Sequence, residues 1–341
     1  MTPRVHHLAL RTDDVAALAA FYRDVLGLEV VRDALPRSLW LGLGPGAVLM
    51  IEAREAGEPA VPAPAAAHGA DVADAEAVAA VLRGVRPDRV VHLAGASSVG
   101  RSFAEPLATW AVNLGGALGV LEALRREAPG TPVLVVTSGE IHGRVPVGDL
   151  PVHEDTPLRP VSPYGASKAA ADLAAAQYRA AYGLPAIRVR AFNHVGPGQD
   201  PRFVLPNVAR QIARAEREGR EAVEVRVGNV DTRRDFTDVR DMVRAYALLL
   251  ERGDPDAAYL ACTGRSIAVR ELIEGLVPLA RTRVTFASDE GLRREGEQPD
   301  LYGSPARLRA DTGWEPEIPL QTTLADTLDW WRERVAEEDR P

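Results

Sequence analysis

Between residues 71 and 192, apolar runs alternate with segments of helical period, and this alternation constrains the fold more than any other feature of the chain. The runs are "RVVHLAG" (89–95), "PVLVVTSGE" (132–140) and "AIRVRAF" (186–192). Short apolar strands that are separated by helices are typical of a parallel sheet with helices on both of its faces. We therefore predict an α/β fold built on a doubly wound parallel sheet.

The regions on either side of this core have different patterns. Residues 1–55 read as strand, helix and three further strands, a βαβββ module whose helix is capped by Asp13 or Asp14. Residues 56–70, "AGEPAVPAPAAAHGA", are rich in proline and alanine and are predicted to form a linker. We expect the core to span residues 71–200, and residues 201–341 to form a small C-terminal substrate domain. Helices are predicted in it at "NVARQIARAEREGR", "DVRDMVRAYALLLERG" and "TTLADTLDWWRERVAEE".

Composition excludes several classes of partner. The chain has 40 basic and 48 acidic residues, so it offers no basic field for nucleic acid. No apolar run approaches the roughly 20 residues of a membrane span, and the first residues lack the apolar core of a signal peptide. The single cysteine, Cys262, is expected to be a small buried thiol. We predict a cytoplasmic protein with no nucleic-acid or membrane partner.

Tyr164 and Lys168, in "SPYGASK", are four residues apart, so on a helix both side chains lie on one face. A nearby ammonium stabilises a phenolate and lowers the pKa of the phenol, which would allow Tyr164 to exchange a proton with a substrate oxygen. Ser138 follows a predicted parallel strand, where ligands bind in open α/β sheets. The competing interpretations are a surface Tyr and Lys, and a turn or capping serine.

Several motifs in the same order resemble the extended short-chain dehydrogenase/reductases (the NAD-dependent epimerase/dehydratase family), which modify nucleotide-activated sugars on a Rossmann-like sheet. These are "RVVHLAGASSVG", "TSGEIHG", "YGASK", "FNHVGPGQ" and "RRDFTDVRD", within a resemblance that runs from about residue 69 to 335. Within that family the chain looks most like the reductases of GDP-4-keto-6-deoxymannose, with GDP-mannose 4,6-dehydratases as close relatives. The resemblance implies NAD(P)-dependent reduction of the 4-keto group of a GDP-sugar, or alternatively 4,6-dehydration or epimerisation.

The resemblance also implies residue roles. Tyr164 would be the acid-base group, Lys168 would bind the nicotinamide ribose, and Ser138 would hold the reacting C4 oxygen. Asp71 and Val72 would lie beside the adenine of the cofactor, and its ribose and diphosphate would be lined by Leu93, Ala94 and Gly95. The substrate diphosphate would be held by Asn193, Arg234 and Arg294, and arginine suits phosphate because its planar fork donates two hydrogen bonds.

Glu140 stands two residues after Ser138, where dehydratases of this family place the base that removes the C5 proton. Its presence keeps dehydration open, and the competing interpretation is an exposed or capping carboxylate. His142 stands where the family usually has a tyrosine, and we expect it to be structural.

The N-terminal region departs from the family because the usual glycine-rich turn between the first strand and helix is missing. That turn brings the cofactor pyrophosphate to the helix N-terminus. Instead, residues 4–55 resemble one βαβββ module of the vicinal oxygen chelate superfamily, which includes glyoxalase I and bleomycin-resistance proteins. His7 matches a metal ligand of that superfamily and Glu52 is the nearest carboxylate, but two ligands from one module do not make a site. We expect a scaffold without metal.

These features leave three hypotheses open. The first is an NAD(P)-dependent enzyme that acts on a GDP-sugar, and the second is a chimera that binds a nucleotide sugar but has lost dinucleotide binding. The third is a glyoxalase-type metalloenzyme. The residue that distinguishes NADP from NAD normally lies on the missing segment. Two predicted helices, "NLGGALGVLEALRREA" and "SKAAADLAAAQYRAAYG", are apolar enough to pair in a homodimer or to cover the sheet.

Overall fold

The computed structural model describes residues 70–289, 291 and 298–338, together with the backbone of four N-terminal strands. Its centre is a sheet of four parallel strands, β5 (Val90–His92), β6 (Val133–Ser138), β7 (Ala186–Ala191) and β12 (Ala258–Ala261), in the order β12-β7-β6-β5. Every residue of β6 and β12 is buried, as expected for strands that are covered on both faces. The predicted doubly wound parallel sheet is confirmed.

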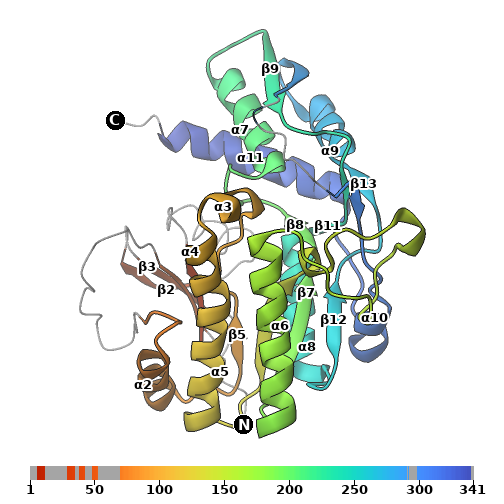
Figure 1. Ribbon diagram of the computed structural model, residues 1–341. Coiled ribbons are helices and arrows are strands. Elements are labelled where there is room, and N and C mark those ends of the chain that lie inside the picture. The colour runs from red at the N-terminus through yellow and green to blue at the C-terminus, as the bar shows by residue number, and fades with distance from the viewer. Residues whose placement is uncertain are drawn as a thin grey trace.

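Helices cover both faces of this sheet (Figure 1). On one face lie α2 (Ala75–Val85), α5 (Gly116–Glu127) and α6 (Pro163–Tyr182), which share a core with β6 and β7. On the other face lie α8 (Val239–Arg252) and α10 (Ala306–Thr312), whose core includes the buried Trp314. The short helices α3 (Val99–Ala104) and α4 (Pro106–Trp110) lead into α5.

Local sequence signals fix the ends of α6, the helix that carries the Tyr-Lys pair. Ser162 caps its N-terminus and accepts a hydrogen bond from the Gly165 amide at 3.0 Å, while Pro163 occupies the first turn, where no amide donor is needed. Gly183 ends the helix in the left-handed conformation, with φ of 71°, which glycine adopts without a steric penalty. The helix therefore begins just before Tyr164.

The C-terminal region forms a second apolar core beside the sheet. It is built from α7 (Val204–Arg217), α9 (Val269–Leu276), α11 (Leu320–Glu338) and the parallel pair β9 (Ala222–Val227) and β14 (Arg283–Ser288). Short strands connect it to the sheet, namely β8 (Asn193–Val195), β10 (Arg233–Arg234), β11 (Phe236–Asp238), β13 (Ile267–Ala268) and β15 (Asp300–Leu301). The helices predicted here are present as α7, α8 and α11, and α9 and α10 were not predicted.

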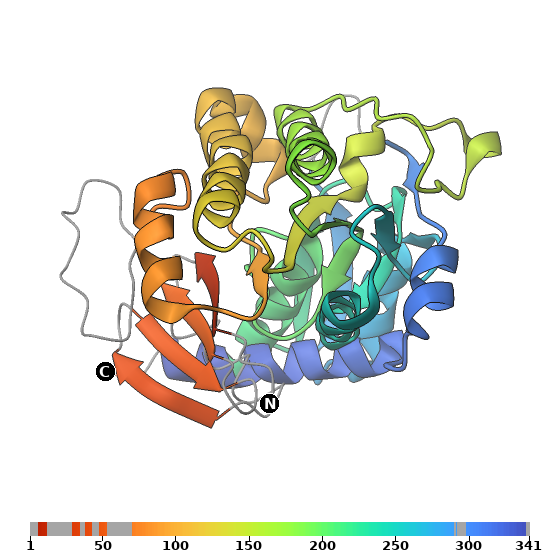
Figure 2. The same ribbon diagram turned by 90° about the horizontal axis from the view of Figure 1, so that it is seen from below.

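The four N-terminal strands are β1 (His6–Arg11), β2 (Glu29–Ala34), β3 (Ser38–Gly42) and β4 (Val48–Glu52), in the order β1-β4-β3-β2. The antiparallel pair β3 and β4 is the hairpin that replaces a glycine-rich strand-to-helix turn. The predicted helix at 13–27 and nearly all of the predicted linker lie outside the described residues. Strand β1 lies alongside β5, so the N-terminal strands adjoin that end of the central sheet (Figure 2).

One described helical stretch, Pro106–Glu127, is long and apolar enough to cross a membrane by composition alone. Half of it is buried within the fold, where α5 packs against α2 and α6. Its apolar character is therefore explained in large part by its contact with the core.

Candidate active site

The catalytic candidates meet at the carboxyl end of β6, as the sequence predicts. Ser138 is the last residue of β6 and is buried. It caps a 3₁₀ turn, Gly139–His142, and its hydroxyl accepts a hydrogen bond from the Glu140 amide at 3.2 Å. The turn therefore fixes Glu140 directly beside the serine.

Tyr164 lies in the first turn of α6 and is buried against this strand end. Burial raises the pKa of Tyr164 to about 12, a hydrogen bond with Ser138 opposes the rise, and the charge of Glu140 adds to it. The expectation that Lys168 lowers this pKa is wrong for the protein alone, because removal of the phenol from water outweighs the other contributions. Tyr164 is consequently protonated at neutral pH.

Lys168 lies one turn further along α6, on the same face as Tyr164, and is also buried. Its ammonium donates a hydrogen bond to the Val136 carbonyl at 2.9 Å. Burial lowers the pKa of Lys168 to about 8, because the charged form loses its hydration. This hydrogen bond ties α6 to the strand that ends in Ser138.

The predicted cofactor residues lie at the adjacent strand end. Leu93, Ala94 and Gly95 follow β5 directly, and Asp71 and Val72 precede α2. A Cβ at Gly95 would lie 2.9 Å from Asn113 Oδ1 and 3.1 Å from Lys168 Nζ, so only glycine fits beside the lysine. The glycine therefore lets the loop after β5 pack closely against the Asn113 and Lys168 side chains.

Val72 packs against the other side of the site. A Cβ at Gly119 of α5 would lie 2.0 Å from the Val72 carbonyl oxygen, so the chain crosses the helix in direct backbone contact. Asp71 is exposed, and its carboxylate accepts a hydrogen bond from the Ala73 amide at 3.0 Å. The segment is thereby fixed on α5, close to the start of that helix.

Asn113 is a site residue that the sequence reasoning missed. It lies in a π-helical turn, Ala111–Gly115, and is buried. Its amide oxygen accepts from the Ala96 amide at 2.8 Å, and its nitrogen donates to the Ala96 carbonyl at 3.2 Å and to Ser167 Oγ at 2.9 Å. Asn113 therefore joins the loop after β5 to α6, and π-helical turns often occur at functional sites. The available signal was a single amide in the apolar run "WAVNLGGALGVL".

His92, the last residue of β5, is buried beneath the same loop. Burial, reinforced by the charge of Lys168, lowers the pKa of His92 to about 3. The imidazole is neutral at physiological pH, so it adds no second positive charge beside the lysine.

The predicted substrate residues come from the connecting strands. Asn193 is exposed on β8, which pairs in parallel with β11. Arg234, on β10, is buried and donates hydrogen bonds to the carbonyls of Arg233 and Gln298 at 2.7 and 2.8 Å. Its Nε also lies 4.0 Å from Glu140 Oε1. The structure thus brings Arg234 and Glu140 together, whereas Arg294 lies outside the described residues.

The metal candidates of the N-terminal strands are not adjacent in the backbone register. Strands β1 and β4 are parallel, and Glu52 is opposite Arg11, whereas His7 lies at the irregularity near Val48 at the other end of the ladder. At about 3.3 Å per residue, the two backbones are separated by roughly 13 Å. In the part of the chain that the structure describes, no group of three His, Cys, Asp or Glu side chains could hold a metal ion.

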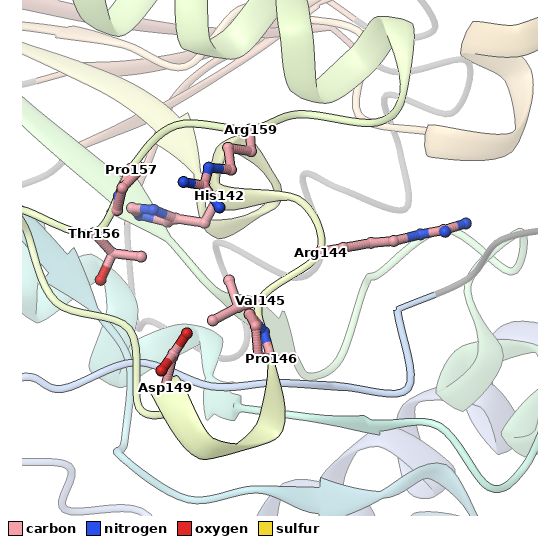
Figure 3. A pocket seen from close by; sticks show the side chains of 8 residues that line it. All are labelled: His142, Arg144, Val145, Pro146, Asp149, Thr156, Pro157 and Arg159. Carbon is pink, nitrogen blue, oxygen red and sulfur yellow. The ribbon is translucent and has the colours of Figure 1, made fainter.

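A pocket of about 170 Å³ lies beside the site, on the loop that follows the 3₁₀ turn (Figure 3). It is lined by His142, Arg144, Val145, Pro146, Asp149, Thr156, Pro157 and Arg159. The Arg144 side chain extends away from the others (Figure 3), and His142 is fully buried. Burial, together with the charge of Arg190, lowers the pKa of His142 to about 4, so this imidazole is also neutral.

Two family models match the chain. The model described as GDP-mannose 4,6 dehydratase matches residues 54–327. The model of the glyoxalase/bleomycin resistance protein/dioxygenase superfamily matches residues 4–93. The resemblances of both parts are therefore confirmed, and the second match extends beyond residue 55, the end expected for the N-terminal module.

Individual relatives agree with the first match. The chain is 40% identical to the GDP-6-deoxy-D-mannose reductase of Pseudomonas aeruginosa, over 74% of this chain and 83% of that protein. It is 32% identical to GDP-mannose 4,6 dehydratase 1 of Arabidopsis thaliana, over 77% of this chain and 73% of that protein. The structure of RMD from Pseudomonas aeruginosa complexed with NADPH superimposes with a TM-score of 0.77 at 32% identity, covering 98% of this chain and 100% of that chain.

Proposed function

The chain belongs to the GDP-mannose 4,6-dehydratase family, and from this premise we propose that it reduces the 4-keto group of a GDP-4-keto-6-deoxyhexose with NADPH, in the cytoplasm. The observation that carries the proposal is the convergence of Ser138, Tyr164 and Lys168 at one strand end. The 40% identity to a GDP-6-deoxy-D-mannose reductase supports this substrate, and the similarity to an NADPH complex supports this cofactor.

The residues beside β5 fit the nicotinamide half of such a cofactor. Gly95 lets the loop after β5 pack closely against Lys168, and Asn113 holds the loop in place by two hydrogen bonds to Ala96. In the proposed complex, Lys168 binds the nicotinamide ribose, and Leu93, Ala94 and Gly95 line the ribose and diphosphate. Asp71 and Val72 lie beside the adenine. When bound, the cofactor supplies the hydride.

Tyr164 is protonated at neutral pH, as a phenol of ordinary pKa would also be, and it can therefore supply the proton that reduction requires. A ketone that gains a hydride also needs a proton on its oxygen, and a buried phenol with a pKa of about 12 retains that proton across the neutral range. Ser138 orients the same oxygen by a hydrogen bond. Oxidation of an alcohol, the first step of dehydration, needs the opposite, deprotonated form of Tyr164.

On the substrate side, Asn193, Arg234 and Arg294 bind the GDP diphosphate in this proposal. Arg234 is held by two backbone carbonyls, which present its guanidinium at a fixed position beside the catalytic turn. A second activity, 4,6-dehydration, is favoured by one observation. The Glu140 amide donates to Ser138 Oγ, its carboxylate lies 4.0 Å from Arg234 Nε, and in this proposal that carboxylate removes the C5 proton.

We also propose that the protein is a homodimer that pairs through α4, α5 and α6. Leu107, Leu118 and Leu173 are exposed on the outer sides of these helices, and Leu107 is 83% exposed. Leu107 lies on α4 and Leu118 on α5, on either side of the π-helical turn Ala111–Gly115. Pairing of two copies would bury these side chains, and sedimentation analysis of the purified protein tests this.

The first experiment is calorimetric titration with NADPH and with NADH, each with and without GDP. Micromolar binding of NADPH is the expected result, and NADH should bind more weakly. No heat with either cofactor, together with a clear signal for GDP, would instead mean a nucleotide-sugar binder that has lost dinucleotide binding. Activity that depends on added divalent metal and needs no dinucleotide would favour the glyoxalase-type hypothesis.

The second experiment separates reduction from dehydration. A reductase consumes NADPH when it is given a GDP-4-keto-6-deoxyhexose, whereas a dehydratase converts GDP-mannose to a 4-keto product without net consumption of cofactor. We expect the first reaction. If the second is found, Glu140→Gln should abolish it, because the amide cannot accept the C5 proton.

A further inference from the structure

Behind the catalytic residues lies a buried ion pair for which the reaction itself has no use. Asp172 of α6 is wholly buried, and Arg190 of β7 is 4% exposed. Arg190 donates from Nε to Asp172 Oδ2 and from Nη2 to Asp172 Oδ1, both at 3.1 Å. Two parallel hydrogen bonds between planar groups fix their mutual orientation as well as their distance.

Further hydrogen bonds extend the pair to the neighbouring elements. Thr137 Oγ1 lies 3.1 Å from the Val189 carbonyl and 3.4 Å from Asp172 Oδ2, so its one hydroxyl proton faces both acceptors. Arg190 Nη1 donates to the Glu154 carbonyl at 2.7 Å. Thr137 and Arg190 are register partners on β6 and β7. The network therefore joins α6, two strands of the sheet and the loop that contains Glu154.

Helix α6 and the strands β6 and β7 each carry or lead to a proposed site residue a short step away. Tyr164, Lys168 and Asp172 follow one another at four-residue intervals, so they form a single stripe along α6. Ser138 is the residue after Thr137, and Asn193 is three residues after Arg190. A rotation or slide of α6 at Asp172 would therefore be transmitted to Tyr164.

We propose that the Asp172–Arg190 pair positions the catalytic groups: it holds α6 against β6 and β7 so that Tyr164 stays within hydrogen-bonding distance of Ser138. This proposal rests on the proposed function, in which these two groups act on one substrate oxygen. Asp172 and Arg190 are positioning residues and do not touch substrate. Because desolvation offsets most of the attraction in a buried ion pair, stability alone is a weak reason for one to be present.

Asp172→Asn and Arg190→Lys test the proposal in complementary ways. The first leaves Arg190, and Arg188 at 3.5 Å from Asp172, without their full partner, and the second keeps the charge of residue 190 but loses the planar fork. Both should lower kcat by roughly 10- to 100-fold, because small displacements of reacting groups have effects of this size. KM for the GDP-sugar should change by less than about threefold, since the loss falls on the transition state.

The matched control is Glu216→Gln in the C-terminal core. Glu216 accepts two hydrogen bonds from Arg332, at 2.7 and 2.9 Å, and belongs to no proposed site. This variant should lower the melting temperature and leave kcat unchanged. Equal losses of kcat in the control and in the two test variants would overturn the proposal.

A measurement that does not depend on turnover tests the positioning role separately from the proposed reaction. In protein labelled with 3-fluorotyrosine, the fluorine resonance of Tyr164 is assigned by its disappearance in Tyr164→Phe. It should shift in Asp172→Asn and Arg190→Lys but not in Glu216→Gln. If the resonance shifts in these two variants but the wild-type protein does not turn over the GDP-sugar, the positioning role is upheld and the proposed reaction is rejected. An unchanged resonance with unchanged kcat in both variants would show that the pair only stabilises the fold. If Asp172→Asn does not fold, Arg190→Lys decides alone.

Discussion

Helix α6 of the central sheet and helix α11 of the C-terminal core both carry a basic side chain with little exposure, in opposite electrostatic settings. Lys168 of α6 is bonded to a backbone carbonyl, and no carboxylate among the described residues forms an ion pair with it. Arg332 of α11 meets Glu216 through two hydrogen bonds, which raise the pKa of the arginine. In the C-terminal core the paired charge of Arg332 serves packing, whereas the unpaired charge of Lys168 reduces stability, which is typical of a functional site.

The largest expected effect is a loss of turnover at the site on α6 with little change in stability. Tyr164→Phe removes the proton donor and should lower kcat by about 10³-fold, which corresponds to about 4 kcal/mol in the activation barrier. The ring remains in place, so the melting temperature should stay within a few degrees of wild type. Steady-state kinetics and thermal unfolding test both parts, and unchanged turnover would remove Tyr164 from the mechanism.

The second-largest expected effect is a loss of stability in the C-terminal core. Glu216→Gln leaves Arg332 without its charged partner and should lower the free energy of unfolding by about 3 kcal/mol, as for other mostly buried pairs. Burial alone would raise the pKa of Glu216, but the hydrogen bonds from Arg332 outweigh it and the pKa is lowered. The stabilisation is therefore present above the usual pKa of 4.5 and is lost as the pH falls through the lower, folded value. Denaturant titrations at neutral and acidic pH should show the wild type and the variant converging in acid.

The smallest expected effect is at Lys168, where removal of a proposed site residue should increase the free energy of unfolding. Lys168→Met removes a buried charge whose pKa falls from 10.5 to about 8, a shift worth about 3 kcal/mol against folding at pH 7. After allowance for the lost hydrogen bond to Val136, the variant should be about 2 kcal/mol more stable.

The pH dependence of this gain follows from the direction of the shift. The folded state disfavours the charged lysine, so the penalty is complete below about pH 8 and disappears as the pH rises towards 10.5. Denaturant titrations at pH 7 and pH 10 should therefore show the advantage of Lys168→Met shrinking. A variant that is less stable than wild type at pH 7 would contradict the idea that this lysine reduces stability.

Periodicity alone predicted the parallel sheet, and the spacing of Tyr164 and Lys168 was enough to place them on one helix face. Ser138 was placed correctly because a strand end is visible in the sequence as the end of an apolar run. These features depend on residues that are close in the chain. The strands within "WLGLGPGAVLMIEA" were predicted for the same reason.

Other features depended on contacts between distant segments, and the sequence did not reveal them. Asn113 bonds to Ala96 and Ser167, which are 17 and 54 residues away. The sign of the pKa shift of Tyr164 was also wrong in the sequence analysis, because burial of a phenol depends on the tertiary fold and a neighbouring lysine in the sequence does not measure it. The proximity of Arg234 to Glu140 likewise links two segments that are far apart in the chain.

Strand β1, from a segment that matches the glyoxalase superfamily, lies beside β5 of a sheet that belongs to another family. Strands β1 and β5 lie at the edges of two separate sheets, so their contact does not require the matched backbone register of a shared ladder. Such an edge is a natural junction for gene fusion. The same junction gives protein engineers a defined place to exchange the N-terminal strands while the catalytic strand ends stay intact.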